Sequence, residues 1–177
     1  MSERSFVVEL PASFVLDRGF PTSAELAYGF SEGFLSRSGV VDVALAKLEA
    51  GVELSPAEER VALLLSDEFD LVDDLVDDLR VGSEPVERRA RFWLLLVLAW
   101  VLERRDEFDD PLGVVELLYA DFDYPEEIEG LVRFMPLQPG QEVGVAALER
   151  RWEAFVDRVT GEYRERSRSM IVAQPEA

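Results

Sequence analysis

The sequence feature that most constrains the fold is an uninterrupted apolar run near the middle of the chain, Phe92 to Leu102. It lies inside a stretch with helical character, residues 86–105, whose two ends carry arginine and glutamate. A helix that is apolar on every side must be covered on every side, so this stretch is predicted to be a buried central helix. A membrane span is disfavoured, because roughly 18 to 20 apolar residues are needed to cross a bilayer.

Local helix signals surround this run. Thr22 followed by Glu25, and Ser55 followed by Glu58, both match the capping box, in which cap and glutamate side chains satisfy free backbone N–H groups. Apolar side chains at helical spacing predict helices over residues 22–34, 40–50, 56–65, 67–80, 86–105, 112–119, 123–134 and 143–166. Because no stretch shows a convincing strand alternation, we predict an all-α protein, with about 7–8 helices in one compact domain over residues 1–177.

The two ends of the chain carry weaker signals. Residues 1–20 alternate apolar and polar side chains only briefly before Pro11, so an extended arm over residues 1–13 or a short strand is expected. The apolar pattern stops after residue 166, which predicts a frayed tail over residues 167–177. The start of the chain has no apolar run of signal-peptide length, and this favours a cytoplasmic location.

Charge restricts the partners. Lys and Arg total 18 against 37 Asp and Glu, a net charge of −19, which repels nucleic acids and anionic membrane surfaces. We therefore expect no nucleic-acid or membrane partner, and any charged partner should be basic. Cys and His are both absent, which removes thiolate nucleophiles, Cys/His zinc sites and imidazole bases. The sequence thus predicts no catalytic residues, no metal site, no cofactor and no enzymatic activity.

A first candidate surface is an acidic segment, residues 67–78. Its carboxylates repel one another at helical spacing and so cost stability. Three interpretations are open: a solvated helix face, a landing surface for a basic partner, or a divalent-metal site in which Asp73 and Asp77 share Mg²⁺ or Ca²⁺. The partner-binding candidates in this segment are Asp70, Asp73, Asp74, Asp77 and Asp78.

A second candidate surface is the junction between two predicted helices, residues 119–129, where aromatic side chains alternate with carboxylates. Asp123 is predicted to cap the second helix, which leaves Asp121 and Glu129 without an evident structural task. A carboxylate pair could act as general acid and base, but no electrophile or metal motif accompanies it, so catalysis is disfavoured. The partner-binding candidates at the junction are Tyr119, Asp121, Asp123, Tyr124, Glu126, Glu127 and Glu129.

The last helix carries most of the remaining arginines. Six of them lie between residues 150 and 168, interleaved with glutamate and aspartate. We expect most of these side chains to form exposed pairs with each other along the helix, each contributing little to stability.

The junction also carries a family resemblance. Residues 119–136, Tyr-Ala-Asp-Phe-Asp-Tyr-Pro-Glu-Glu-Ile-Glu-Gly-Leu-Val-Arg-Phe-Met-Pro, resemble the signature of a bacterial family of small acidic proteins of unknown function, proposed to be immunity proteins of polymorphic toxin systems. Further parts of the chain similar to the family are residues 25–36, Val40, Val41, Ala44, Trp152 and Phe155. The resemblance spans roughly Phe14 to Val156, and the family supplies no established active site.

Three functions follow as hypotheses. The resemblance implies a protein that binds a cognate toxin domain and neutralises it by occlusion, and the net charge favours a basic toxin domain. The acidic segment favours, as an alternative, a general interaction module that mimics nucleic acid on a basic surface. A metal-dependent hydrolase that uses only Asp and Glu ligands is a remote third hypothesis.

Overall fold

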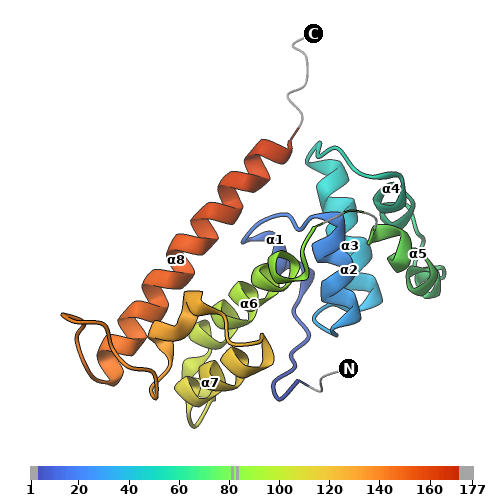
Figure 1. The fold of residues 1–177 in the computed structure, drawn as a ribbon. Helices are drawn as coiled ribbons and strands as arrows, with labels where there is room; N and C mark the ends of the chain where they lie inside the picture. Colours follow the sequence, from blue (N-terminus) through green and yellow to red (C-terminus); the bar gives the residue numbers. More distant parts are fainter. Residues whose placement is uncertain (1–3, 81, 83, 172–177) are drawn as a thin grey trace. The chain divides into compact units, whose positions relative to one another are not determined.

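The computed structural model describes residues 4–80, 82 and 84–171 (Figure 1). These residues form eight α-helices and three 3-10 helices, and they contain no strand, only an isolated bridge between Val52 and Ile171. The predicted all-α class is confirmed. The helices are α1 (Ala12–Leu16), α2 (Ser23–Ser31), α3 (Arg37–Glu49), α4 (Pro56–Ala62), η1 (Phe69–Leu71), α5 (Val72–Leu79), α6 (Val86–Glu103), η2 (Arg105–Glu107), α7 (Pro111–Asp121), η3 (Glu126–Leu131) and α8 (Val145–Met170).

The chain divides into two compact units. One, called here the η3 unit, comprises residues 1–7 and 94–159, and the other, the α3 unit, comprises residues 8–93 and 160–177. Helices α6 and α8 contribute residues to both. The single domain predicted over residues 1–177 stays a prediction.

The predicted buried helix is α6. Every side chain from Phe92 to Ala99 is buried, as is Val101, which confirms the interpretation of the apolar run. No helix among the described residues combines the length and apolar content that a bilayer crossing requires.

In the α3 unit, α3 packs against α1, α2, α4 and α5. Trp93 at the N-terminal part of α6 stacks on Phe34, with ring centroids 5.6 Å apart, and donates a hydrogen bond to the Glu25 carbonyl at 2.7 Å. A Cβ atom on Gly29 would lie 2.0 Å from the Trp93 ring, so only glycine permits this approach. Gly29 therefore lets α2 pack closely against the Trp93 ring.

Both predicted capping boxes are present, and their glutamates do more than cap. Glu25 is 1% exposed and accepts two hydrogen bonds from Arg166, at 2.8 and 2.7 Å. Glu58 is 3% exposed and pairs with Lys47, the single lysine of the chain. Lys47 is itself buried and also donates to the Pro21 carbonyl at 2.7 Å. Within the α3 unit, one ion pair thus joins the start of α2 to α8, and the other joins the start of α4 to α3.

These pairs correct the expectation for the last helix. Arg166 pairs with Glu25 of α2, and Arg164 donates a hydrogen bond to the Asp17 carbonyl. Arg151 donates to the Gly130 carbonyl at 2.8 Å. Arg168, by contrast, pairs along the helix as expected, with Glu165. Charge pattern alone did not reveal these long-range partners.

Several boundaries also differ from those predicted. Helix α3 begins at Arg37 and not at Val40, because the Ser36 hydroxyl accepts from Gly39 N at 3.1 Å and caps the helix. Residues 5–11 form no strand; they precede α1. The frayed tail is wrong for residues 167–170, which continue α8 because the Ser167 hydroxyl donates to Tyr163 O and accepts from Phe20 N. Residues 172–177 lie outside the described part of the chain.

Candidate functional site

The candidate site is the junction in the η3 unit, where α7 ends and η3 begins. Asp123 N donates to Ala120 O at 3.1 Å and Tyr124 N donates to Tyr119 O at 2.8 Å, which closes the last turn of α7. Asp123 and Tyr124 then adopt left-handed backbone conformations, with φ of 61° and 57°. Residues other than glycine rarely adopt this backbone region, least of all bulky ones. Each such residue lowers the folding stability by on the order of 1 kcal/mol or more. This unfavourable backbone conformation therefore occurs at Tyr124 itself, whose side chain is exposed.

The left-handed pair overturns one prediction. Asp123 does not cap a helix over residues 123–134; Pro125 occupies the N-cap position, and only the 3-10 helix Glu126–Leu131 forms. An aspartate cap requires extended backbone, and Asp123 is left-handed instead. The carboxylate of Asp123 remains exposed.

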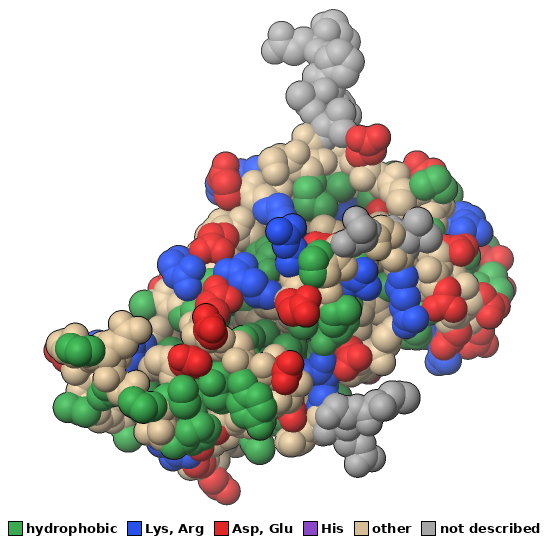
Figure 2. Space-filling view, viewed as in Figure 1, with side chains coloured by type: hydrophobic (Ala, Val, Ile, Leu, Met, Phe, Trp, Pro, Cys, Tyr) green, Lys and Arg blue, Asp and Glu red, His purple; other side chains and the backbone are tan. Residues whose placement is uncertain are grey.

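Tyr124 belongs to a cluster of three aromatic rings. Tyr119 is buried, and the rings of Tyr124 and Phe134 pack against it with centroids 5.2 and 6.3 Å away. Tyr124 is nevertheless 58% exposed and Phe134 is 64% exposed. Figure 2 shows hydrophobic side chains gathered over the α7 and η3 region. We call Tyr119, Tyr124 and Phe134 the aromatic cluster.

Next to the aromatic cluster, the loop after η3 encloses a shallow hollow of about 220 Å³. Among its lining residues are Met135, Leu137, Val143 and Val145. Val143 is the most exposed of these, at 80%. Apolar surface therefore extends beyond the three rings.

Two arginines hold this surface in place. Arg133 contacts both Asp110 and Glu116, with nitrogen–oxygen distances from 2.7 to 3.1 Å. Its guanidinium lowers the pKa of the Asp110 and Glu116 carboxyls. Arg151 donates to the Gly130 and Glu142 carbonyls at 2.8 and 2.9 Å. These contacts tie the exposed loop to α7 and α8.

Asp121 has a structural task that the sequence did not reveal. Its two carboxylate oxygens accept hydrogen bonds from Ser5 N and Phe6 N, both at 2.9 Å. Arg4 donates to the Asp121 carbonyl and lies over the Phe122 ring. Asp121 thus anchors the N-terminal segment and is less available to a partner.

The remaining junction carboxylates surround the aromatic cluster unevenly. Glu129 accepts from the Tyr119 hydroxyl at 3.5 Å, and burial together with this carboxylate raises the pKa of Tyr119. Glu127 lies 3.8 Å from the Arg158 guanidinium. Asp123 and Glu126 are exposed and form no ion pair with any described residue. These two carboxylates are the ones best placed to meet a cationic partner.

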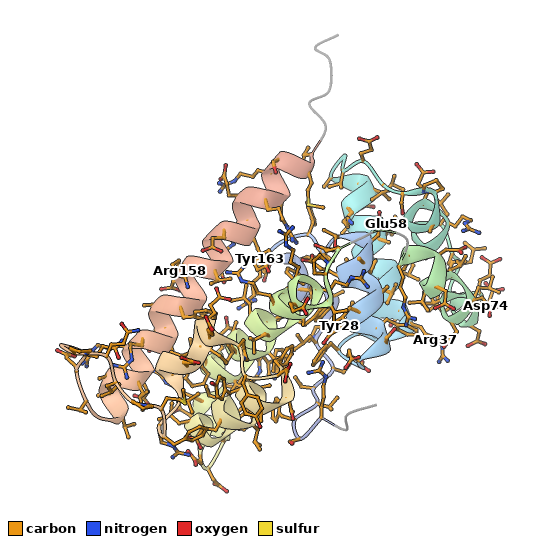
Figure 3. All side chains as sticks on the ribbon, viewed as in Figure 1. Tyr28, Arg37, Glu58, Asp74, Arg158 and Tyr163 are labelled. Atoms are coloured by element: carbon orange, nitrogen blue, oxygen red, sulfur yellow. The ribbon has the colours of Figure 1, made fainter. Side chains whose placement is uncertain are left out.

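The candidates of residues 67–78 belong to the α3 unit, with Asp70 in η1 and the other four aspartates in α5. Three of these aspartates are paired: Asp73 with Arg37 at 2.5 Å, Asp78 with Arg60 at 2.6 Å, and Asp77 with Arg80 at 3.1 Å. Asp70 is 4.0 Å from Arg37, and the hydrogen bond from Arg37 lowers the pKa of Asp73. Asp74, labelled on α5 in Figure 3, has no ion pair within the described residues.

The metal hypothesis gains no support from this geometry. Within the described part of the chain, no group of three or more carboxylates is arranged to hold a metal ion. Asp73 and Asp77, the predicted ligands, each contact an arginine.

Phe134 is the main site residue that sequence reasoning missed. It lies in the run quoted for the family resemblance, but it was assigned to the end of a helix. The 3-10 helix η3 ends at Leu131, where Val132 adopts extended backbone, and this leaves Phe134 outside any helical stripe. Pro125 and Pro136 on either side were the available signal for an irregular segment.

The η3 unit of this all-α protein thus exposes an ordered aromatic cluster beside carboxylates. Residues 12–160 match the model of a family described as "Uncharacterized protein conserved in bacteria (DUF2247)". The match covers most of the chain, so the protein belongs to this family, which confirms the predicted membership of a bacterial family of unknown function. No curated protein and no solved structure matches the chain.

Proposed function

We propose that the protein is an immunity protein, which binds a cognate polymorphic toxin domain and neutralises it by occlusion. In this proposal it acts by stoichiometric binding and not by turnover. The aromatic cluster is the centre of the contact surface, and Asp123 and Glu126 meet cationic groups of the toxin.

Support comes mainly from Tyr124. Exposed tyrosines are enriched among the residues that dominate binding energy, because a rigid ring adds contact area at little cost in conformational entropy. Tyr124 is 58% exposed but held by its backbone bond to Tyr119 and by ring packing. A side chain that is ordered before binding loses less entropy when a partner covers it.

Charge gives further support. A net charge of −19 accelerates association with a basic partner at low salt and repels nucleic acid and anionic membranes. A standard interface would bury about 1,600 Å² in total. The aromatic cluster and the adjoining hollow supply an apolar centre for such an interface, with carboxylates at its edge.

The test is neutralisation of the toxin-domain product of the adjacent gene. Co-expression should restore growth, and the two proteins should co-purify. Tyr124→Ala and Phe134→Ala should each raise Kd roughly 30-fold, the effect of losing about 2 kcal/mol at a dominant contact. Both rings are exposed, so the variants should unfold at the wild-type temperature.

A matched control is Val86→Ala in the α3 unit, whose side chain is 59% exposed and which should leave Kd unchanged. Toxin binding that survives Tyr124→Ala/Phe134→Ala would exclude the aromatic cluster as its centre. Failure of every neighbouring toxin-like product to bind would exclude the immunity role itself.

A further inference from the structure

A second surface lies in the α3 unit, where α4 and α5 pack together. The end of α4, η1 and α5 enclose an apolar hollow of about 400 Å³. Its lining consists of Arg60, Leu63, Leu64, Leu71, Asp74 and Leu75. Four of these six side chains are leucines.

The leucines are unusually open to solvent. Leu63 is 69% exposed and Leu71 is 45% exposed, and the neighbouring Leu65 is 65% exposed. The sequence places Leu71 on one apolar stripe with α5, but Leu71 belongs to η1, and only Val72, Val76 and Leu79 of that stripe are buried. Contiguous exposed apolar groups with a polar rim mark interaction sites.

The acidic segment that contributes Leu71, Asp74 and Leu75 to the lining favours an occupant of positive charge. Residues 67–78 contribute seven carboxylates, and Arg37, Arg60 and Arg80 are the cations that pair with them, which leaves an excess of four negative charges. Arg60, the cation in the lining, is already paired with Asp78 at 2.6 Å. Asp74 lines the hollow and has no ion pair within the described residues. A cation beside an apolar group is thus complementary to this surface.

We propose that this hollow binds a basic amphipathic segment of a protein partner. An apolar side chain of the segment enters between Leu63 and Leu71, and a neighbouring Lys or Arg pairs with Asp74. This inference goes beyond the proposed function, because it concerns a surface in the α3 unit and requires no toxin. Such an occupant would cover the exposed side chains of Leu63 and Leu71.

The probe is a fluorescein-labelled synthetic helix of leucine and lysine at amphipathic spacing, titrated into the full-length protein. Two comparison peptides separate the contributions: one replaces each leucine by serine, and the other replaces each lysine by glutamate. The Leu/Lys peptide should bind at least 10-fold more tightly than the Ser/Lys peptide, because only the former buries apolar surface. The Leu/Glu peptide should not bind.

Variants locate the binding. Leu63→Ser/Leu71→Ser should raise Kd for the Leu/Lys peptide at least 10-fold, and Asp74→Asn should raise it roughly 3-fold at moderate salt. Two controls are Leu45→Ser/Leu48→Ser, which changes two leucines of α3 that are each 38% exposed, and Asp157→Asn on α8. Both should leave Kd within about 2-fold of wild type. Unchanged melting temperatures exclude unfolding as the cause.

Two results would overturn the inference: wild-type binding by Leu63→Ser/Leu71→Ser, or equal binding of the Leu/Lys and Ser/Lys peptides. The outcome is separable from that of the proposed function. Tyr124→Ala/Phe134→Ala should bind the peptide as wild type does. Toxin neutralisation without peptide binding would refute only the binding role of the hollow. Peptide binding without any toxin partner would refute only the immunity role.

Discussion

Two groups of carboxylates within the α3 unit have opposite environments. Glu25 and Glu58, at the starts of α2 and α4, are buried and paired with cations that are distant in sequence. The aspartates of α5 are exposed, and their arginine partners are also exposed. Figure 3 shows Glu58 among the helices and Asp74 at their outer edge. The same chemical group therefore stabilises the fold in one place and remains available for contact in the other.

The largest expected effect comes from breaking the most buried pair. Lys47→Met leaves the Glu58 carboxylate buried without its cation, and removal of one partner of a buried pair costs about 3–5 kcal/mol. Urea unfolding followed by circular dichroism measures the loss. In the double variant Lys47→Met/Glu58→Gln, which also removes the uncompensated charge, we expect recovery of more than about 1.5 kcal/mol. A double variant no more stable than Lys47→Met would show that the pair is not what holds α4 to α3.

The second pair should matter less. Arg166→Met removes two hydrogen bonds to Glu25 and one to the Phe20 carbonyl. The arginine is 29% exposed, so water can partly replace it, and the expected loss is about 2 kcal/mol. A loss larger than that of Lys47→Met, measured under the same conditions, would reverse the ranking of the two pairs.

The pH dependence of stability should separate the two glutamates by sign. Burial raises the pKa of Glu25 above the usual 4.5, and Arg166 only partly offsets it. Its stability contribution is present below 4.5 and is lost as pH rises through the raised pKa. Burial also opposes ionisation of Glu58, but Lys47 lowers its pKa overall, so its contribution is present above 4.5 and lost as pH falls.

The corresponding measurement compares unfolding free energies of wild type, Glu25→Gln and Glu58→Gln between about pH 3 and pH 8. As pH falls, the advantage of wild type over Glu58→Gln should shrink, whereas its advantage over Glu25→Gln should grow. Parallel slopes for the two variants would contradict the opposite directions of the pKa shifts of Glu25 and Glu58.

The smallest effect is expected at α5. Asp74→Asn removes repulsion from Asp70 and Asp78, one turn away on either side, and breaks no ion pair among the described residues. The change in unfolding free energy should be at most about 0.5 kcal/mol and stabilising in sign. The matched variant Arg37→Ala, which breaks the exposed pair with Asp73, should cost at most about 1 kcal/mol. A loss of 2 kcal/mol or more in the unfolding free energy of Asp74→Asn would show that this carboxylate stabilises the fold, as Glu25 and Glu58 do.

Much of the fold could be predicted because helix starts are local. Thr22 with Glu25 and Ser55 with Glu58 satisfy backbone groups within four residues, and both boxes form as predicted. The apolar run of α6 is likewise buried, since no arrangement of a folded chain leaves so many apolar side chains in water. The predicted cap at Asp123 failed because the backbone of Asp123 and Tyr124 departs from the helix there.

The candidate site was only partly predictable. Tyr124 and Glu126 were identified from their alternation with other aromatic and acidic residues, and both are exposed. Asp121 was indistinguishable from them in sequence, yet it binds the backbone of residues more than a hundred positions earlier. Phe134 and Leu71 were assigned to helical stripes, and their exposure depends on where η3 and η1 end.

The amino-acid sequence by itself determined the all-α class, the helix starts, the buried α6 and the acidic character, because these depend on residues within a few positions of one another or on composition. Only the tertiary structure decided which carboxylates became buried pairs, which leucines stayed in solvent and which tyrosine was presented. Those outcomes depend on groups distant along the chain, such as Arg166 and Glu25, that meet only when the helices pack. The local periodicity of the sequence contains no information about these long-range contacts.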